Sequence, residues 1–513
     1  MDGQQADAED WGPFGRPLFD DPSSRALSRV GVIDVGSNSV RLVIFDGAAR
    51  SPAYFYNEKI MCALGAGLGE TGRLSPEGRA RALSAMKRFA AVARAAQVKD
   101  ISIAATAAVR DATDGPDFRA DVERETGLKI WVVSGREEAR LAAQGVLLGW
   151  PGSYGLVCDI GGSSMELAEI EGEKVGRRET SELGPLKLKS VKGGKKGRKA
   201  VIDENLDRMK AAFGSQRNRL FLVGGSWRAF ARIDMERRGY PLHVLHEYRM
   251  SAKDVRATAE FIKKSDLEEL RHMCHLSAAR MSLVPLASEV LVRLVGRFKP
   301  YDIAISSYGI REGLLYEQMP ERLRERDPLI EACRFAEAKD ARLPGFGNRL
   351  DKFLAPLFRK APLEEQRLIK AACLLHDVSW RAHPDYRADV CFDNATRANL
   401  GGMKHSERVF LGLALLHRYK NSREGSRIEA LVPMLSEAEA HRAEVLGKAM
   451  RFGAMLWAEA DDTLAELSWA PKKKVLGLKL TKAAEPLFGE VAQARLQSLA
   501  DALGAETEVK IRK

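Results

Sequence analysis

A short pattern that occurs twice constrains the fold of this chain more than any other feature. An apolar, β-branched run at 30–33 leads into Asp34-Val35-Gly36-Ser37-Asn38-Ser39 and then into a second apolar run at 40–45. About 125 residues later the same order returns, with runs at 154–158 and 165–170 flanking Asp159-Ile160-Gly161-Gly162-Ser163-Ser164. Two such strand–turn–strand units predict two related α/β halves with a cleft between them.

Length and composition indicate how many domains the chain contains. A chain of 513 residues suggests about three domains, and 45% hydrophobic with 29% charged residues excludes a largely disordered protein. We predict a flexible tail over 1–28, one α/β half over 29–148, a second over 149–317, a helical domain over 318–470, and a small α/β appendage over 471–513.

The cysteines and the hydropathy indicate the cellular compartment in which the protein is expected. The six cysteines are scattered without a C-x-x-C pair, which excludes a disulfide framework and a thiolate zinc site and fits a reducing cytoplasm. The N-terminus is acidic, unlike that of a signal peptide. The longest uncharged stretch, 141–158, contains a proline and several glycines, so we expect no membrane partner.

The Gly/Ser turns are candidate phosphate-binding loops, because glycine lets backbone N–H groups approach a phosphate and hydroxyls add donors. Either turn alone is as well explained by an ordinary hairpin, but two in equivalent places favour the phosphate interpretation. A third glycine turn follows an apolar run at 220–223. The predicted phosphate ligands are Gly36, Ser37, Asn38, Ser39, Gly161, Gly162, Ser163, Ser164, Gly225 and Ser226. Asp34 and Asp159, at the strand ends, are placed to hold Mg²⁺.

The histidines restrict the choice of a general base. All nine lie at or beyond His243, so catalysis in the first half would need a carboxylate instead. The candidates are Asp34, Glu138, Asp159 and Glu166. Glu138 begins a predicted helix, where capping of the helix dipole is the alternative explanation. Arg110 follows a predicted strand and is a candidate cation for a phosphoryl oxygen, unless it is a solvated surface arginine.

The chain has a net charge of +11, and one short segment is especially rich in basic residues. Seven cations fall within 13 residues with no acid among them: Lys187, Lys189, Lys192, Lys195, Lys196, Arg198 and Lys199. Gly193, Gly194 and Gly197 predict a flexible loop. A solvated charge run is the usual explanation, and nucleic acid is disfavoured because no aromatic residue is interleaved for base stacking. The composition suits a linear anion without bases.

Six ordered motifs resemble the exopolyphosphatase / guanosine pentaphosphate phosphohydrolase (Ppx/GppA) family, which belongs to the actin, sugar-kinase and chaperone ATPase superfamily. They are IDVGSNSVRLVI (33–44), ATAAVR (105–110), VSGREEARL (133–141), CDIGGSSMEL (158–167), VGGSWRA (223–229) and YGIREGLLYE (308–317). A further segment, YPLHVLHEY (240–248), resembles α-proteobacterial members. The resemblance implies an α/β fold with a duplicated actin-like (ribonuclease H-like) core, followed by a mainly α HD-like domain and a small α/β appendage.

The resemblance also implies roles for individual residues. Glu138, the second Glu of the EEAR motif, would be the general base, and Asp159 and Glu166 would anchor Mg²⁺ and the attacking water. Arg110 and Arg311 match family arginines near the phosphate site. The second loop reads DIGGSSME where the family commonly has DIGGGSTE, which puts one phosphate contact in question. Mg²⁺, a monovalent cation such as K⁺, and a homodimer are the implied cofactors and assembly.

The helical region resembles an HD-type domain through LLHDVSWRAHPDYRA (374–388). A working HD site needs an earlier His, then His-Asp, then a later Asp. His376-Asp377 is present, and His383, His405 and His417 follow, but the predicted helix at 348–358 contains no histidine. We therefore expect a degenerate domain for dimerisation and chain binding.

The predicted function is Mg²⁺-dependent, processive release of orthophosphate from the end of inorganic polyphosphate. One alternative is conversion of guanosine pentaphosphate to tetraphosphate by the same residues. A kinase would share the fold, although no sugar-binding segment is recognisable. A non-catalytic sensor of polyphosphate or alarmone, or a nucleic-acid binder, is the alternative from another class.

Overall fold

The computed structural model describes residues 26–214, 219–424, 428–456 and 464–512, and the chain divides into two compact units, one ending at Arg326 and one beginning at Asp327. Most of the predicted tail at 1–28 lies outside the described residues, while the first strand already begins at Ala26. The first unit extends past the predicted boundary at residue 317, because Leu323 is buried in its core.

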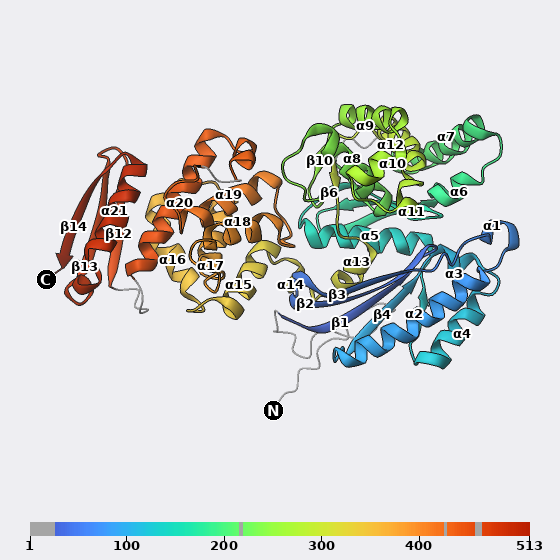
Figure 1. Ribbon diagram of the computed structural model, residues 1–513, viewed down its shortest axis with the longest axis horizontal. Coiled ribbons are helices and arrows are strands. Elements are labelled where there is room, and N and C mark those ends of the chain that lie inside the picture. The colour runs from blue at the N-terminus through green and yellow to red at the C-terminus, as the bar shows by residue number, and fades with distance from the viewer. Residues whose placement is uncertain (1–25, 215–218, 425–427, 457–463, 513) are drawn as a thin grey trace. The chain divides into compact units, whose positions relative to one another are not determined.

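The first half of this unit is a five-stranded sheet with helices on its outer face (Figure 1). Its strands follow the order β3-β2-β1-β4-β5. Its elements are β1 (Ala26–Val35), β2 (Ser39–Ala48), β3 (Ser51–Met61), α1 (Leu68–Thr71), α2 (Pro76–Ala95), β4 (Asp100–Ala105), α3 (Ala107–Asp111), α4 (Gly115–Thr126), β5 (Trp131–Val132) and α5 (Gly135–Gly149).

The second half repeats this arrangement in a six-stranded sheet of order β10-β11-β9-β6-β7-β8. Its elements are β6 (Tyr154–Ile160), β7 (Met165–Glu171), β8 (Lys174–Ser181), α6 (Pro185–Lys189), α7 (Gly194–Phe213), β9 (Arg219–Val223), α8 (Gly225–Arg238), β10 (Arg249–Met250), α9 (Ala252–Lys264), α10 (Leu267–Met273), α11 (Ala278–Met281), α12 (Val284–Phe298), β11 (Asp302–Ile305), α13 (Ile310–Glu317) and α14 (Glu321–Arg324). The predicted duplicated α/β core is thereby confirmed. The third strand of each half, β3 and β8, was not predicted, because these partly exposed strands lack an apolar run.

Two helices, α5 and α13, lie between the two sheets (Figure 1). Their apolar residues share one core with side chains of β1 and β2 on one side and of β6, β7 and β9 on the other. The two helices cross closely at glycines: a Cβ built on Gly145 would lie 2.2 Å from the Gly309 carbonyl oxygen, and one on Gly313 would lie 1.8 Å from that of Leu141. This crossing fixes the two halves against each other.

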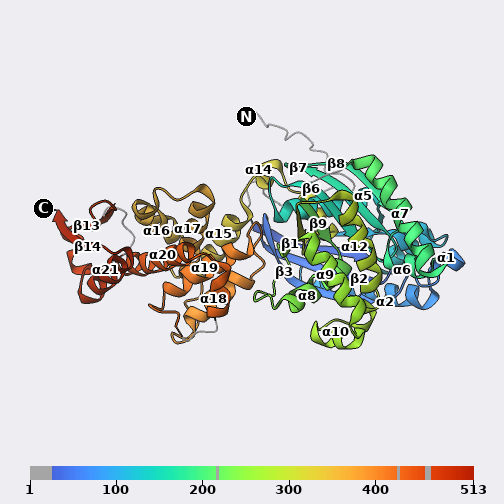
Figure 2. The same ribbon diagram turned by 90° about the horizontal axis from the view of Figure 1, so that it is seen from above.

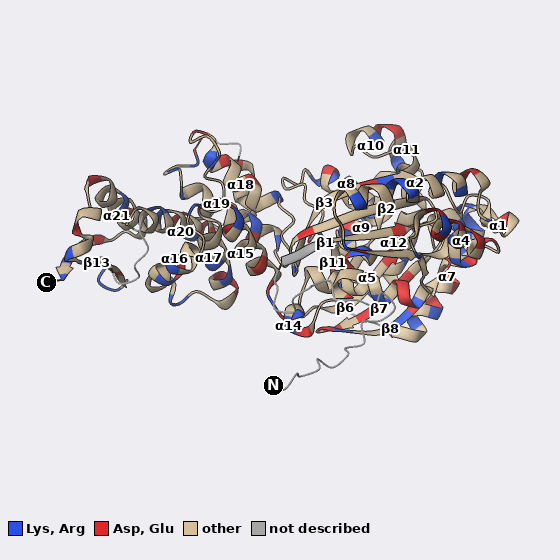
Figure 3. Ribbon diagram, turned by 90° about the horizontal axis from the view of Figure 1, so that it is seen from below, with Lys and Arg blue, Asp and Glu red and all other residues tan. Residues whose placement is uncertain are grey.

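The basic segment forms the end of α6, a short turn at 190–193 and the start of α7 rather than a flexible loop, which corrects the sequence prediction. Lys and Arg are good helix formers, and α7 buries Ile202, Leu206 and Met209 against the second half. Gly197 serves close packing, because a Cβ there would lie 2.0 Å from the Lys192 carbonyl oxygen. Over the ribbon as a whole, basic and acidic residues are interspersed (Figure 3).

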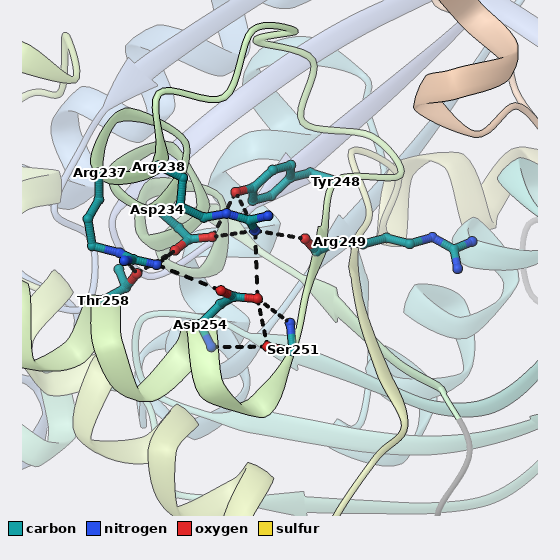
Figure 4. A network of polar contacts seen from close by, with 8 residues as sticks. All are labelled: Asp234, Arg237, Arg238, Tyr248, Arg249, Ser251, Asp254 and Thr258. Carbon is teal, nitrogen blue, oxygen red and sulfur yellow. Dashed lines mark hydrogen bonds and ion pairs between the residues drawn. The ribbon is translucent and has the colours of Figure 1, made fainter. Parts of the chain in front are cut away.

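A buried ionic network joins α8 to α9 and to the segment before β10 (Figure 4). Asp234, fully buried on α8, accepts hydrogen bonds from Tyr248 (2.7 Å) and Arg237 (2.8 Å) and also one from Thr258. Arg238 lies 3.4 Å from the same carboxylate. Since α8 begins at Gly225, this network anchors the far end of the helix whose start enters the cleft described below.

The second unit consists of a helical part followed by a three-stranded sheet (Figure 2). Its elements are α15 (Pro328–Asp340), α16 (Phe346–Leu354), α17 (Leu363–Leu375), α18 (Arg387–Arg397), α19 (His405–His417), α20 (Glu437–Leu456), β12 (Ala465–Ala470), β13 (Val475–Thr481), α21 (Glu490–Leu503) and β14 (Glu506–Arg512), with 3₁₀ turns at Ala355–Phe358, Glu429–Met434 and Lys482–Leu487. The sheet begins at β12, within the region predicted to be helical.

Candidate active site

The two predicted phosphate loops face each other in the first unit. In each loop the first glycine N–H donates to the carbonyl of the closing serine: Gly36 to Ser39 and Gly161 to Ser164, both at 3.0 Å. The Ser163 hydroxyl donates to the Ser37 hydroxyl across the gap (3.2 Å). The two turns therefore have the same internal geometry and meet at one place.

Carboxylates gather beneath these loops. Asp34 and Asp159 are the penultimate residues of β1 and β6. Glu166 is paired with Asp159 across β6 and β7 and so points to the same face of the sheet. Glu138 stands in the first turn of α5. Glu138, Asp159 and Glu166 are all buried. The Thr180 hydroxyl donates to one Glu166 oxygen (3.0 Å), and the guanidinium of Arg110 lies 3.6 Å from Glu138.

The pKa values of these buried carboxyl groups are all raised. Burial, together with the charges of Glu166 and Asp159, raises the pKa of Glu138 well above its usual range. Burial raises the pKa of Asp159 to about 6, and burial with the charge of Asp159 raises that of Glu166 to about 8. Glu138 Oε2 and Glu166 Oε2 are buried without a hydrogen-bond partner in the described structure. Such a cluster favours a bound cation or shared protons.

Cations line the same cleft. Arg41, Lys59, Arg228, Arg280 and Arg311 come from five different elements: β2, β3, α8, α11 and α13. Burial and the neighbouring guanidinium groups lower the pKa of Arg41 to about 10 and that of Lys59 to about 8. Nη1 of Arg311 is buried without a hydrogen-bond partner among the described residues. Crowded cations of this kind form a site for a multiply charged anion.

The two loops and the two sets of charges line a single cleft of about 200 Å³. Of the predicted site residues, the cleft is lined by Asp34, Gly36, Ser37, Asn38, Ser39, Glu138, Asp159, Gly161, Gly162, Ser163, Ser164, Gly225 and Arg311. Glu166 is buried behind Asp159, and Ser226 is buried on α8, where it accepts a hydrogen bond from Arg280 (3.3 Å). The structure thus brings together the two loops and all four predicted carboxylates.

Sequence reasoning missed four of the five cations. Arg41 lies across β1 and β2 from Asp34, just as Glu166 lies across β6 and β7 from Asp159. The duplicated motif therefore held a signal: the same position carries an arginine in one half and a glutamate in the other. Lys59 and Arg280 lie on elements without a recognisable motif, so only packing reveals them.

A second groove, of about 240 Å³, adjoins the first and shares Ala107, Ser163 and Ser164 with it. Arg110, Lys187 and Arg208 line this groove, which leads from the loops toward the basic helices. Two cations of the basic segment have acidic partners outside the run: Lys187 pairs with Glu182 and Arg198 with Glu289. Lys189, Lys192, Lys195, Lys196 and Lys199 are exposed.

In the second unit, Asp377 is bound by an arginine. The Arg342 guanidinium donates to both Asp377 oxygens, and His376 is buried with Nδ1 2.8 Å from the Cys373 carbonyl oxygen. Across the described residues of the chain, no three His, Cys, Asp or Glu side chains form a group suited to hold a metal ion. No helix in the described part combines the length and apolar composition needed to cross a bilayer.

Residues 43–322 match the Ppx/GppA phosphatase family, and residues 352–509 match the exopolyphosphatase C-terminal domain. The first match covers more than half of the sequence. The chain belongs to the Ppx/GppA phosphatase family. This confirms the family predicted from the six motifs.

Named relatives and a solved structure agree with this membership. Exopolyphosphatase 1 of Mycobacterium tuberculosis is 32% identical over 143 residues, which is 27% of this chain and 42% of that protein. Retrograde regulation protein 2 of Saccharomyces cerevisiae is 24% identical over 455 residues, covering 78% of this chain and 74% of that protein. A crystal structure of an exopolyphosphatase from Cytophaga hutchinsonii has a TM-score of 0.53 at 24% identity, covering 57% of this chain and 98% of that chain. That likeness confirms the fold of the first unit.

Proposed function

We propose that this chain is an exopolyphosphatase, which hydrolyses the terminal phosphoanhydride of inorganic polyphosphate and releases orthophosphate. The observation that carries the proposal is the single cleft in which two touching glycine–serine loops, carboxylates and five cations come together. Loop N–H groups and hydroxyls would hold the terminal phosphoryl group, and the cations would neutralise it and the phosphates behind it.

Glu138 is the proposed general base. It lies in the cleft at the start of α5, and its Oε2 makes no hydrogen bond within the described structure. A water oxygen attacks the terminal phosphorus, its proton passes to Glu138, and the bond to the bridging oxygen breaks, so that orthophosphate and a chain one unit shorter result. Arg110, 3.6 Å from Glu138, opposes the rise in its pKa and would orient the carboxylate.

The carboxylate cluster fits a divalent cation such as Mg²⁺. Asp159 and Glu166, with Asp34 nearby, would hold it, and the unpaired oxygen of Glu166 supports this assignment. Mg²⁺ usually takes one or two carboxylates and keeps waters or phosphate oxygens as its other ligands, so no complete protein cage is required. When bound, it would offset charge on the phosphoryl oxygens and lower the pKa values of the neighbouring carboxyl groups.

The cleft favours polyphosphate over guanosine pentaphosphate, the second candidate. Its described lining holds glycines, serines, charged residues and a few aliphatic side chains, without an aromatic ring on which a base would stack. The second groove, with Arg110, Lys187 and Arg208, would carry the rest of the chain to the basic helices α6 and α7. Weak binding at many points there would favour processive shortening. The buried, unbonded cysteines support a reducing compartment such as the cytoplasm.

The direct test compares phosphate release from long polyphosphate by wild type and by Glu138→Gln. We expect turnover to fall by about 10²–10⁴-fold, the usual contribution of a general base. Glu137→Gln is the matched control, since Glu137 pairs with Arg140 outside the cleft. Wild-type turnover by Glu138→Gln would refute the base assignment. No phosphate release by wild type from polyphosphate or pentaphosphate nucleotide would instead favour a non-catalytic regulator, the class suggested by the name of the yeast relative.

A second test concerns the chain path. Replacing Lys195, Lys196 and Lys199 with Gln should weaken the binding of long polyphosphate chains more than that of short ones, because only long chains would reach α7. Arg198 is left in place because it pairs with Glu289. Lys253→Gln/Lys263→Gln/Lys264→Gln on α9 removes the same number of charges and is the control for total charge. Equal effects on the binding of long and short chains would show that the basic segment does not contact the polyphosphate chain.

A further inference from the structure

Lys59 differs in its chemistry from the other cations of the cleft. It is the single amine among the described lining residues, and the other cations there are Arg41, Arg228, Arg280 and Arg311. A guanidinium keeps its proton and is a poor nucleophile, whereas a lysine amine that has lost its proton attacks carbonyl carbon atoms. Lys59 stands on β3 and is exposed, so a small molecule in the cleft can reach it. Lys59 can therefore do more than neutralise a phosphate.

The sheet of the first half places Lys59 in a row with two other charged residues. Arg41 on β2 is the cross-strand partner both of Asp34 on β1 and of Lys59 on β3. The three side chains therefore share one face of the sheet, and Arg41 stands between Lys59 and the Asp34 carboxylate. Within the described part of the chain, no carboxylate lies within 4 Å of the Lys59 amine. The amine thus has a cation as its neighbour on the sheet and lacks an acidic partner that would hold its proton.

The surroundings of Lys59 favour the neutral amine. Desolvation in the cleft lowers the pKa of Lys59, and the charges of three neighbouring arginines lower it further, to about 8 instead of 10.5. In order of their effect, the arginines are Arg280, Arg41 and Arg228. At pH 7.5 roughly a quarter of amines with such a pKa are neutral, against about 0.1% of ordinary lysines. Nearby cations are one of the means by which proteins activate a lysine nucleophile.

We propose that Lys59 is a site of acylation by acyl phosphates, small molecules in which a carboxylic acyl group is joined to phosphate through oxygen. The two glycine–serine loops would hold the phosphoryl group, so the inference rests on the phosphate binding of the proposed function. The neutral amine attacks the carbonyl carbon, the bond from that carbon to the bridging oxygen breaks, orthophosphate leaves, and the surplus amine proton passes to water. The product is an uncharged amide. Acylation would therefore remove one of the five cations and weaken the binding of polyphosphate.

Acetyl phosphate is the probe, applied to the full chain, with acetylation at each lysine followed over time by peptide mass spectrometry. We expect Lys59 to react at least about tenfold faster than Lys174, an exposed lysine at the start of β8 outside the cleft. Orthophosphate should slow the reaction at Lys59 by occupying the loops and should leave the rate at Lys174 unchanged. With acetic anhydride, which has no phosphoryl group, the preference for Lys59 should shrink. Equal rates at the two lysines, no protection by orthophosphate, or the same preference with both reagents would overturn the proposal.

Phosphate release from polyphosphate provides a second readout. Treatment of the wild type with acetyl phosphate should raise the KM for polyphosphate about tenfold, because one charged contact is lost. Lys59→Arg carries a cation that is not acetylated, so the same treatment should leave the KM of this variant at its own untreated value. An equal rise in KM in Lys59→Arg would assign the effect to other lysines and overturn the proposal.

The two proposals fail in different ways. If the wild type releases no phosphate from polyphosphate, but Lys59 is still acetylated selectively and orthophosphate still protects it, the exopolyphosphatase proposal alone is wrong. If the wild type releases phosphate, but acetyl phosphate modifies Lys59 and Lys174 at the same rate, the acylation proposal alone is wrong.

Discussion

Substituting alanine for Gly145 perturbs the crossing of α5 and α13 without touching a charged group. The new Cβ would lie 2.2 Å from the Gly309 carbonyl oxygen and 2.8 Å from its carbon, both backbone atoms that no rotamer change can move. The helices would have to separate by about 1 Å to reach ordinary contact, and overpacking of this kind costs about 1–3 kcal/mol. Alanine regains up to about 1 kcal/mol in helix propensity, which offsets part of that loss.

The separation would also reach the proposed catalytic groups. Glu138 stands on α5 and Arg311 on α13, so the crossing sets their spacing across the cleft. A misplacement near 1 Å typically costs about 10²-fold in rate. Phosphate release from polyphosphate and urea unfolding of the full chain measure the two effects. We expect Gly145→Ala to lower turnover by about 10²-fold and stability by about 1–2 kcal/mol.

Gly296→Ala on α12 is the control for helix propensity. Gly296 also lies inside a helix, but no atom lies within 4 Å of its Cβ position, so alanine should leave turnover unchanged and add up to about 1 kcal/mol of stability. The reasoning is refuted if Gly145→Ala retains wild-type stability and turnover, because the close approach of the two helices would then set neither quantity.

Three further predictions follow from particular groups. Arg228→Met should raise the KM for polyphosphate of every length by about tenfold or more, because Arg228 lies in the cleft itself; an increase confined to long chains would contradict this. Asp234→Ala should lower the stability of the first unit by about 3 kcal/mol or more, since it removes the acceptor of the buried Tyr248 and Thr258 hydroxyls (Figure 4); a loss under 1 kcal/mol by urea unfolding would be inconsistent. Burial lowers the pKa of His376 and of His417 to about 4, so the unfolded chain binds protons first as the pH falls below about 6.5. The second unit should therefore lose stability between pH 6.5 and 4, by about 2 kcal/mol per histidine at pH 5, and His376→Gln should flatten this dependence; an unchanged slope in that variant would show that His376 is not its source.

The turns were predictable because their chemistry is local. Asp34 to Ser39 and Asp159 to Ser164 are contiguous residues whose glycines and hydroxyls favour the same turn wherever they stand. Their repetition identified the duplicated core, and the lack of histidine before His243 pointed to a carboxylate base. By contrast, the partly exposed strands β3 and β8 went undetected, because strands without an apolar run leave a weak periodic signal.

The basic segment shows how context overrides composition. Its glycines and cations predicted a loop, but buried residues at helical spacing further along α7 hold the second half of the segment, from Gly194 on, as a helix. In the same way, Glu182 and Glu289 supply acidic partners that the run itself lacks.

The sequence by itself determined the duplicated α/β core, the two phosphate turns and the candidate carboxylates, because each depends on neighbouring residues or on a repeated pattern. Only the tertiary structure decided which cations face those turns. Arg41 and Arg280 come from elements far apart in the chain and meet through the packing of two sheets around α5 and α13. Local residue chemistry encodes turns and strands, whereas the meeting of distant side chains depends on how the whole core packs.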